Sequence, residues 1–163
     1  MNAATLNLNA GTYAVTLDDD GIIARAMEIL ADRLYKPSTV LESPDIVKKY
    51  LQLKMSKHTM QEVFSVIFLD AQHAVMEYRE MFFGTLTQTS VYPREVARIA
   101  LELGAAAVIL AHNHPSGNVT PSHADEHLTR TLKSALSLVD VRVLDHIIVG
   151  GGDSLSMAEK GLV

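Results

Sequence analysis

Apolar positions recur along this chain with two different periods, and the difference separates the helices from the strands. In some segments they return every three or four residues after an acidic or proline-containing start, which is typical of amphipathic helices. In others they form short runs between turn signals, which is typical of strands. The first pattern predicts helices over residues 18–36, 44–53, 93–104 and 122–138. The second predicts strands over residues 63–69, 74–83, 105–111 and 141–149.

The order of these segments predicts an α/β fold. The first two strands are separated only by the turn at residues 70–73, so we expect them to pair antiparallel. The strand at residues 105–111 is apolar throughout, as expected for a strand that is buried on both faces of a sheet. Residues 1–17 are polar, small and without period, and they predict no function.

The composition is that of an ordinary soluble globular protein. The 163 residues are 48% hydrophobic and 20% charged, which is enough to bury one core. No apolar run approaches the roughly 20 residues that span a bilayer. Residues Met1–Asp20 also lack the basic and apolar segments of a signal peptide. We therefore expect a cytoplasmic protein with no membrane partner.

The absence of cysteine narrows the chemistry that the chain can perform. It excludes disulfides, thiolate zinc sites, cysteine nucleophiles and the cysteine-bearing signature of zinc deaminases. Any reaction must therefore use histidine, carboxylate or hydroxyl groups. The net charge of −5 argues against a nucleic-acid footprint over the whole protein, because such a footprint requires clustered lysine and arginine.

Two histidines and an aspartate predict a metal site. His112 and His114 are one residue apart at the end of a strand, so their side chains point to the same side. Asp125 heads the inner stripe of helix 122–138, where a carboxylate is costly unless it is paired or bound to metal. A catalytic zinc site typically has three such ligands and a fourth position for water. We therefore expect one Zn²⁺ per chain.

A structural alternative exists for the same residues. Ser122 and Asp125 have the spacing of a capping box, and the two histidines could be ordinary polar residues at a strand end. The inner stripe of the helix continues after Asp125 through Leu128, Leu132, Ala135, Leu136 and Val139.

Three further polar residues near these segments predict supporting roles. Asp145 and His146 interrupt the last apolar strand and alternate to opposite faces, which favours a structural role or one behind the metal ligands. Asn113 faces away from the two histidines and is expected to organise a loop.

The run from His112 to Asp125 resembles the JAMM motif of the MPN-type metalloproteases. Its flanks narrow the resemblance to the RadC-like branch of that superfamily, through Gly84–Leu86, Val91–Glu95, Ala111–Gly117 and Asp145–Val149. The likeness covers about residues 41–163 and leaves residues 1–40 as an N-terminal extension with one helix. It implies a mixed, curved β-sheet flanked by helices, of the JAMM/MPN (cytidine-deaminase-like) fold, with zinc bound by His112, His114 and Asp125.

The resemblance also implies a zinc-dependent hydrolase, a metallopeptidase or isopeptidase that acts on a protein or peptide. Ser122 would orient water or stabilise the oxyanion of a tetrahedral intermediate. A glutamate outside the histidine motif would act as general base. Glu62 is the candidate, because it immediately precedes strand 63–69, the place that this glutamate occupies in the superfamily. Glu95, within the Pro93–Glu95 signature, is the alternative.

A second function from a different class is a non-hydrolytic module, associated with DNA repair or scaffolding, whose metal site is structural. RadC-like relatives usually carry an N-terminal helix-hairpin-helix region suggestive of DNA binding. Residues 1–40 lack its glycine-rich hairpins and are acidic at Asp18–Asp20. DNA is therefore the weaker expectation as a partner.

Overall fold

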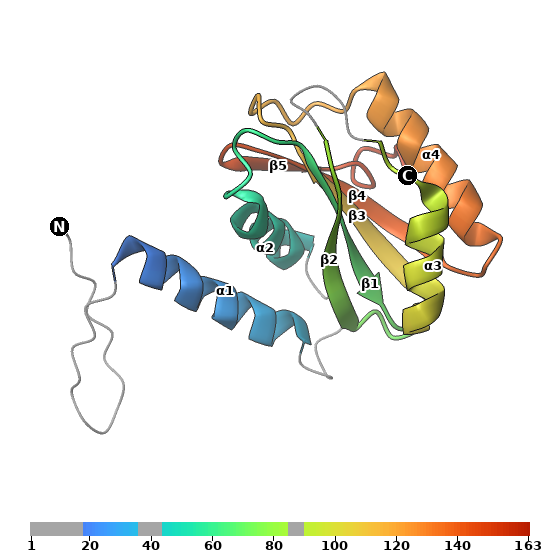
Figure 1. Cartoon of the computed structure of the whole chain (residues 1–163), viewed down its shortest axis with the longest axis horizontal. Helices are drawn as coiled ribbons and strands as arrows, with labels where there is room; N and C mark the ends of the chain where they lie inside the picture. Colours follow the sequence, from blue (N-terminus) through green and yellow to red (C-terminus); the bar gives the residue numbers. More distant parts are fainter. Residues whose placement is uncertain (1–17, 36–43, 85–89) are drawn as a thin grey trace.

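The sheet lies between two groups of helices (Figure 1). A computed structural model describes residues 18–35, 44–84 and 90–163. Helix α2 (Pro44–Met55) covers one face of the sheet, and α3 (Pro93–Leu103) and α4 (His123–Ser137) cover the other. Helix α1 (Asp19–Tyr35) contacts α2 and one edge of the sheet. The expected α/β architecture with a mixed sheet is confirmed.

Five strands form the sheet in the order β2-β1-β3-β4-β5. Strand β1 pairs antiparallel with β2 and with β3, β3 pairs parallel with β4, and β4 pairs antiparallel with β5. Their bounds are β1 Val63–Leu69, β2 Val75–Phe83, β3 Ala107–Asn113, β4 Arg142–Gly150 and β5 Asp153–Ser156. The pattern of apolar residues did not predict β5, which is short and follows β4 after a tight turn.

Strand β3 ends two residues later than its apolar run predicted. His112 pairs with Phe64 of β1 and with Ile148 of β4, and Asn113 pairs with Val149 of β4. These ladders continue past the apolar run because β3 has neighbours on both sides. The strand therefore delivers His112 and Asn113 from its last two positions.

The alternation of side chains along β3 divides the core into two parts. Val108 and Leu110 pack with α3 and α4, whereas Ile109 and Ala111 pack with α2. By the same alternation His112 lies on the α4 side of the sheet and Asn113 on the α2 side.

A β-bulge at Leu144 shifts the faces of β4. Val108 pairs with Val143 and Ile109 pairs with Asp145, so Leu144 has no partner in β3. After the bulge His146 pairs with Leu110, whose side chain faces α4. The extra residue therefore turns His146 onto the same face of the sheet as His112.

Several expectations concern residues outside the described ranges. They are the absence of function in residues 1–17, the boundary at residue 40 and the Thr85–Leu86 part of the sequence motif. Within the described part of the chain, no helix has both the length and the apolar character needed to cross a membrane.

Candidate metal centre

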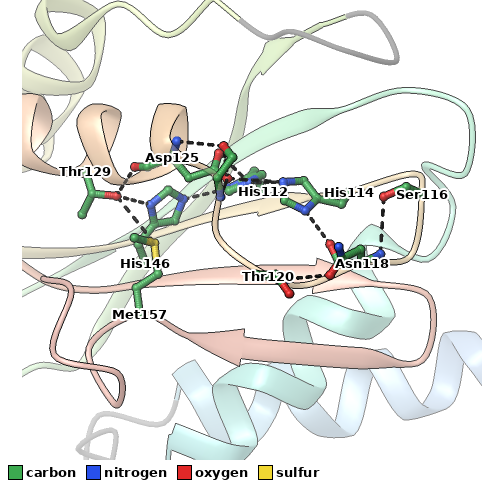
Figure 2. Close-up of polar contacts among 10 residues, drawn as sticks. His112, His114, Ser116, Asn118, Thr120, Asp125, Thr129, His146 and Met157 are labelled. Atoms are coloured by element: carbon green, nitrogen blue, oxygen red, sulfur yellow. Dashed lines mark hydrogen bonds and ion pairs between the residues drawn. The ribbon is translucent and has the colours of Figure 1, made fainter.

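Three side chains predicted as metal ligands meet at one point between β3 and α4. The Nε2 atoms of His112 and His114 lie 2.9 Å apart. Asp125 places Oδ1 3.2 Å from Nε2 of His112 and Oδ2 3.6 Å from Nε2 of His114. We refer to these three residues as the His–His–Asp cluster; it is shown in Figure 2.

The orientation of His114 is fixed by the loop that follows β3. Its backbone N–H donates to the carbonyl of Val149 at 2.7 Å, and its Nδ1 lies 2.6 Å from the carbonyl oxygen of Asn118. A carbonyl oxygen can only accept, so Nδ1 of His114 is the donor in this contact. Nε2 is then the nitrogen whose lone pair can bind a metal ion.

Asp125 serves the helix and the cluster at the same time. Its Oδ2 accepts hydrogen bonds from the backbone N–H and the hydroxyl of Ser122, both at 2.7 Å, and the Ser122 hydroxyl oxygen accepts from the backbone N–H of Asp125. This is a complete capping box at the start of α4. The structural alternative from the sequence is therefore present, and Oδ1 still faces His112.

The charges within the cluster are strongly coupled. Burial alone would raise the pKa of the Asp125 carboxyl, but hydrogen bonding to His112 and His114 outweighs it and holds the pKa well below its usual range. The hydrogen bond to Asp125 raises the pKa of His114, opposed by burial and helped by the Asn118 carbonyl and by the nearby charge of Glu62. The cluster is thus built around a carboxylate that stays ionised.

The donor set fits a zinc ion. Two imidazole nitrogens and one carboxylate oxygen lie within 4.8 Å of one another. Tetrahedral zinc with bonds of about 2.0–2.1 Å requires ligand atoms about 3.4 Å apart, close to the spacings of 2.9, 3.2 and 3.6 Å found here. Only small movements of the three side chains separate this arrangement from that geometry.

Two buried residues stand behind the cluster. Nε2 of His146 lies 2.8 Å from Nδ1 of His112, and its Nδ1 lies 2.6 Å from the hydroxyl oxygen of Thr129. Burial, reinforced by the nearby His112, lowers the pKa of His146 well below its usual value. Sequence reasoning missed Thr129, because the stripe was traced through apolar residues. Its position one helical turn after Asp125 was the available signal.

Asp145 faces the other side of β4 from His146. Its carboxylate accepts hydrogen bonds from the backbone N–H groups of His146 and Ala158 and from the hydroxyl of Ser156. It therefore ties β4 to β5 and to the C-terminal turn. This arrangement agrees with the opposite faces that alternation predicted for Asp145 and His146.

Asn113 holds the segment that carries Glu62. Its Oδ1 accepts from the backbone N–H of Val63 at 2.7 Å, and its amide donates to the carbonyls of His58 and Gln61 at 2.8 and 2.9 Å. We call these three contacts the Asn113 clamp. Glu62 lies between the clamped residues, close enough for its charge to raise the pKa of His114.

Glu95 lies in a different setting. It begins α3, where its carboxylate pairs with Arg94 at 3.4 Å and with Arg98 at 3.2 Å. These contacts and the helix dipole account for an acidic residue at this position. Among the described residues, Glu62 and not Glu95 acts electrostatically on a member of the cluster.

The cluster opens toward solvent on the side of His114. The His112 side chain is 2% exposed, whereas that of His114 is 19% exposed. A pocket of about 170 Å³ also has His114 in its lining. It is lined by the loop after β3, the end of α2 and the end of β4, including Met55, His58, Thr59, Ser116 and Val149.

Comparison with known proteins gives a family for this arrangement. Residues 41–162 match the model of the RadC-like JAB domain. The UPF0758 protein of Variovorax paradoxus is 59% identical over 142 residues, which cover 87% of this chain and 62% of that protein. The UPF0758 protein of Verminephrobacter eiseniae is 58% identical over 142 residues, covering 87% of this chain and 59% of that protein. This chain thus spans about three fifths of the length of the curated relatives it matches.

Proposed function

The chain belongs to the RadC-like JAB domain family, and on this basis we propose that it is a zinc-dependent hydrolase that cleaves peptide or isopeptide bonds. The observation that carries the proposal is the His–His–Asp cluster, a set of three ligands between β3 and α4, together with a glutamate, Glu62, whose charge acts on His114. A purely structural zinc site is closed by four protein ligands, whereas a hydrolytic site combines three ligands with a base at its open side.

In this proposal His112, His114 and Asp125 hold the ion. Zinc bound here would supply a Lewis acid that acidifies water and polarises the substrate carbonyl. The three ligands have the composition and the spacing for this role, and Asp125 is already ionised and hydrogen-bonded by Ser122. Ser122 thereby orients Asp125. The family resemblance implies that its hydroxyl also orients water or stabilises an oxyanion, for which its proton must turn from Oδ2 of Asp125 toward the substrate.

Glu62 acts as the general base. Its carboxylate accepts one proton from the attacking water as the oxygen adds to the substrate carbonyl carbon. It then gives this proton to the leaving nitrogen as the carbon–nitrogen bond breaks, so that the protons balance. The Asn113 clamp holds the backbone on both sides of Glu62, which limits the positions that its carboxylate can take.

The substrate is a protein or a peptide. The pocket beside His114 has the volume of an amino-acid side chain, and its lining mixes apolar groups such as Met55 and Val149 with polar groups such as His58 and Ser116. A side chain next to the scissile bond would occupy it.

The test combines metal content with hydrolysis. Protein purified without an affinity tag should contain about one zinc per chain by plasma mass spectrometry, and a His112→Ala/His114→Ala variant should contain none. Zinc-dependent cleavage of a broad peptide and isopeptide panel should disappear in His112→Ala and Asp125→Ala. His127→Ala, which removes an exposed histidine of α4, is the matched control and should change neither quantity.

Three results would contradict the proposal. Full cleavage in His112→Ala and Asp125→Ala would exclude the mechanism. Negligible metal in the wild type after incubation with zinc would exclude the site. Full zinc occupancy without any cleavage would favour the non-hydrolytic module, whose metal is structural.

A further inference from the structure

His146 is a buried histidine that touches the His–His–Asp cluster without belonging to it. It is 0% exposed, and its ring meets that of Phe64 edge-on with centroids 5.7 Å apart. One ring nitrogen faces His112 and the other faces Thr129, so both nitrogens have a partner (Figure 2). The direction of these two hydrogen bonds follows from the partners of Thr129.

Thr129 has a single hydroxyl proton and two close partners. Its Oγ1 lies 2.6 Å from the backbone carbonyl oxygen of Asp125 and 2.6 Å from Nδ1 of His146. Both distances are short enough to require a hydrogen bond. The carbonyl can only accept, so Thr129 donates to Asp125, and Nδ1 of His146 must donate to Thr129. Met157, whose Sδ lies 3.7 Å from Oγ1, brings no competing proton.

The donor and the acceptor in the contact between His146 and His112 can be assigned as well. Thr129 has placed a proton on Nδ1 of His146, and a metal ion on Nε2 of His112 would leave the one ring proton of His112 on Nδ1, facing His146. Nε2 of His146 is then an acceptor. Nδ1 of His112, 2.8 Å away, must be the donor in that contact. In that metal-bound state Nε2 of His112, which faces His114 and Asp125, presents its lone pair to the ion.

We infer that Thr129 and His146 are positioning residues that transmit the hydrogen-bond direction of helix α4 to His112, so that in the metal-bound site His112 donates from Nδ1 and binds the ion through Nε2. We call this chain the Thr129–His146 relay. It begins at the backbone of Asp125 and ends at His112, and thus links two ligands from different elements. In His114 the proton is likewise on Nδ1, because Nδ1 donates directly to the Asn118 carbonyl. The inference rests on the proposed metal site.

Nuclear magnetic resonance of the histidine rings reads this arrangement directly. After addition of zinc, long-range proton–nitrogen correlations of the full chain should show His146 protonated on Nδ1 and not on Nε2, and His112 protonated on Nδ1. Comparison with His146→Gln assigns the ring signals. This measurement needs neither a substrate nor hydrolytic activity, so it stands apart from the test of the proposed function.

Variants of Thr129 test whether the relay matters for the ligand. Thr129→Val removes the hydroxyl at nearly constant volume, so His146 is no longer fixed in one tautomer, and zinc affinity should fall about 10- to 100-fold. Thr129→Ser keeps the hydroxyl and should restore both the spectrum and the affinity. Thr131→Val is the matched control, because Thr131 also donates to the carbonyl four residues earlier, that of His127 at 2.9 Å, but is exposed and lies outside the relay.

The outcomes separate clearly. A proton on Nε2 of His146 in the zinc-loaded wild type would overturn the inference, whether or not the protein cleaves peptides and whether or not Thr129→Val folds. Unchanged zinc affinity in a folded Thr129→Val variant would also overturn it. Nδ1 protonation with a selective loss of affinity in Thr129→Val, rescued by Thr129→Ser, would support it even if no substrate were found.

Discussion

The side-chain oxygen of Asn113 accepts a hydrogen bond from the backbone N–H of Val63 at 2.7 Å, which joins the end of β3 to the start of β1 directly after Glu62. The two amide protons of Asn113 are used as well, by the carbonyls of His58 and Gln61. A single buried side chain therefore sets the path of the segment that carries the proposed base. It leaves β3 on the opposite face from His112, so it supports the site without crowding the ligands.

Replacing Asn113 by Asp should destabilise the protein. The acceptor for Val63 remains, but two donors are lost and a carboxylate faces two carbonyls, so the free energy of unfolding should fall by about 2–5 kcal/mol. Urea denaturation measures this change. Gln61→Ala, which alters an exposed side chain but keeps the clamped carbonyl, should stay within about 0.5 kcal/mol of the wild type. An equal free energy of unfolding for Asn113→Asp and the wild type would show that the Asn113 clamp does not stabilise the fold.

Glu62 and Glu95 are distinguished by one pair of matched variants. Glu62→Gln should retain about one zinc per chain and lose about 100- to 10,000-fold in kcat, because proton transfer is removed while the ligands remain. Glu95→Gln should retain both zinc and kcat, since its carboxylate pairs with Arg94 and Arg98 at the start of α3. Steady-state kinetics on a cleaved peptide measures kcat for the two variants and so identifies which glutamate is the base. The reverse pattern would assign the base to Glu95.

Gly150 allows close contact between β4 and the loop that orients His114. A Cβ atom at this position would lie 2.6 Å from the carbonyl oxygen of Gly117 and 3.0 Å from Cγ1 of Val119. The loop must then move, and with it the Asn118 carbonyl that holds Nδ1 of His114. We expect Gly150→Ala to lower the free energy of unfolding by about 1–3 kcal/mol and to weaken zinc binding.

The neighbouring Gly152 supplies the control for this substitution. A Cβ atom there would meet nothing within 4 Å, so Gly152→Ala should leave stability and zinc affinity unchanged. Calorimetric unfolding and zinc titration of the two variants give the comparison. Tight zinc binding by Gly150→Ala would mean that the loop adapts without disturbing His114.

Glu80 should give the protein an acid-sensitive contribution to stability. Burial would raise the pKa of its carboxyl, but Lys57 and His58, whose side-chain nitrogens lie 3.1 and 3.2 Å from Oε1, outweigh burial and lower the pKa below the usual 4.5. The ionised form is thus the stabilising one. Its contribution is present above pH 4.5 and is lost as the pH falls through the lowered pKa of the folded protein.

Glu80→Gln tests this sign. The variant should be about 1 kcal/mol less stable than the wild type above pH 4.5, and the difference should close at lower pH. Urea denaturation at several pH values measures it. Glu102→Gln, which removes an exposed partner of Arg98, is the control and should show little difference at any pH. A gap that widens in acid would contradict the assignment.

The sequence by itself determined the local elements and the composition of the cluster. Period-two alternation at the end of a strand predicts that His112 and His114 point to the same side, although His114 itself follows the last residue of β3. Helical periodicity places Asp125 on the inner face of the next helix. These features depend on residues that are close in the chain, so pattern alone is sufficient, and the two elements are joined by a loop short enough to bring them together.

Only the tertiary structure decided which residues stand behind the ligands. Alternation shows that Asp145 and His146 face opposite ways, but the bulge at Leu144 determines which one faces His112. A bulge is a property of the pairing between two strands, and β3 and β4 are separated by a whole helix in the sequence. Thr129 likewise has no apolar signature. Its role arises from a hydrogen bond across elements, which depends on packing and not on local periodicity.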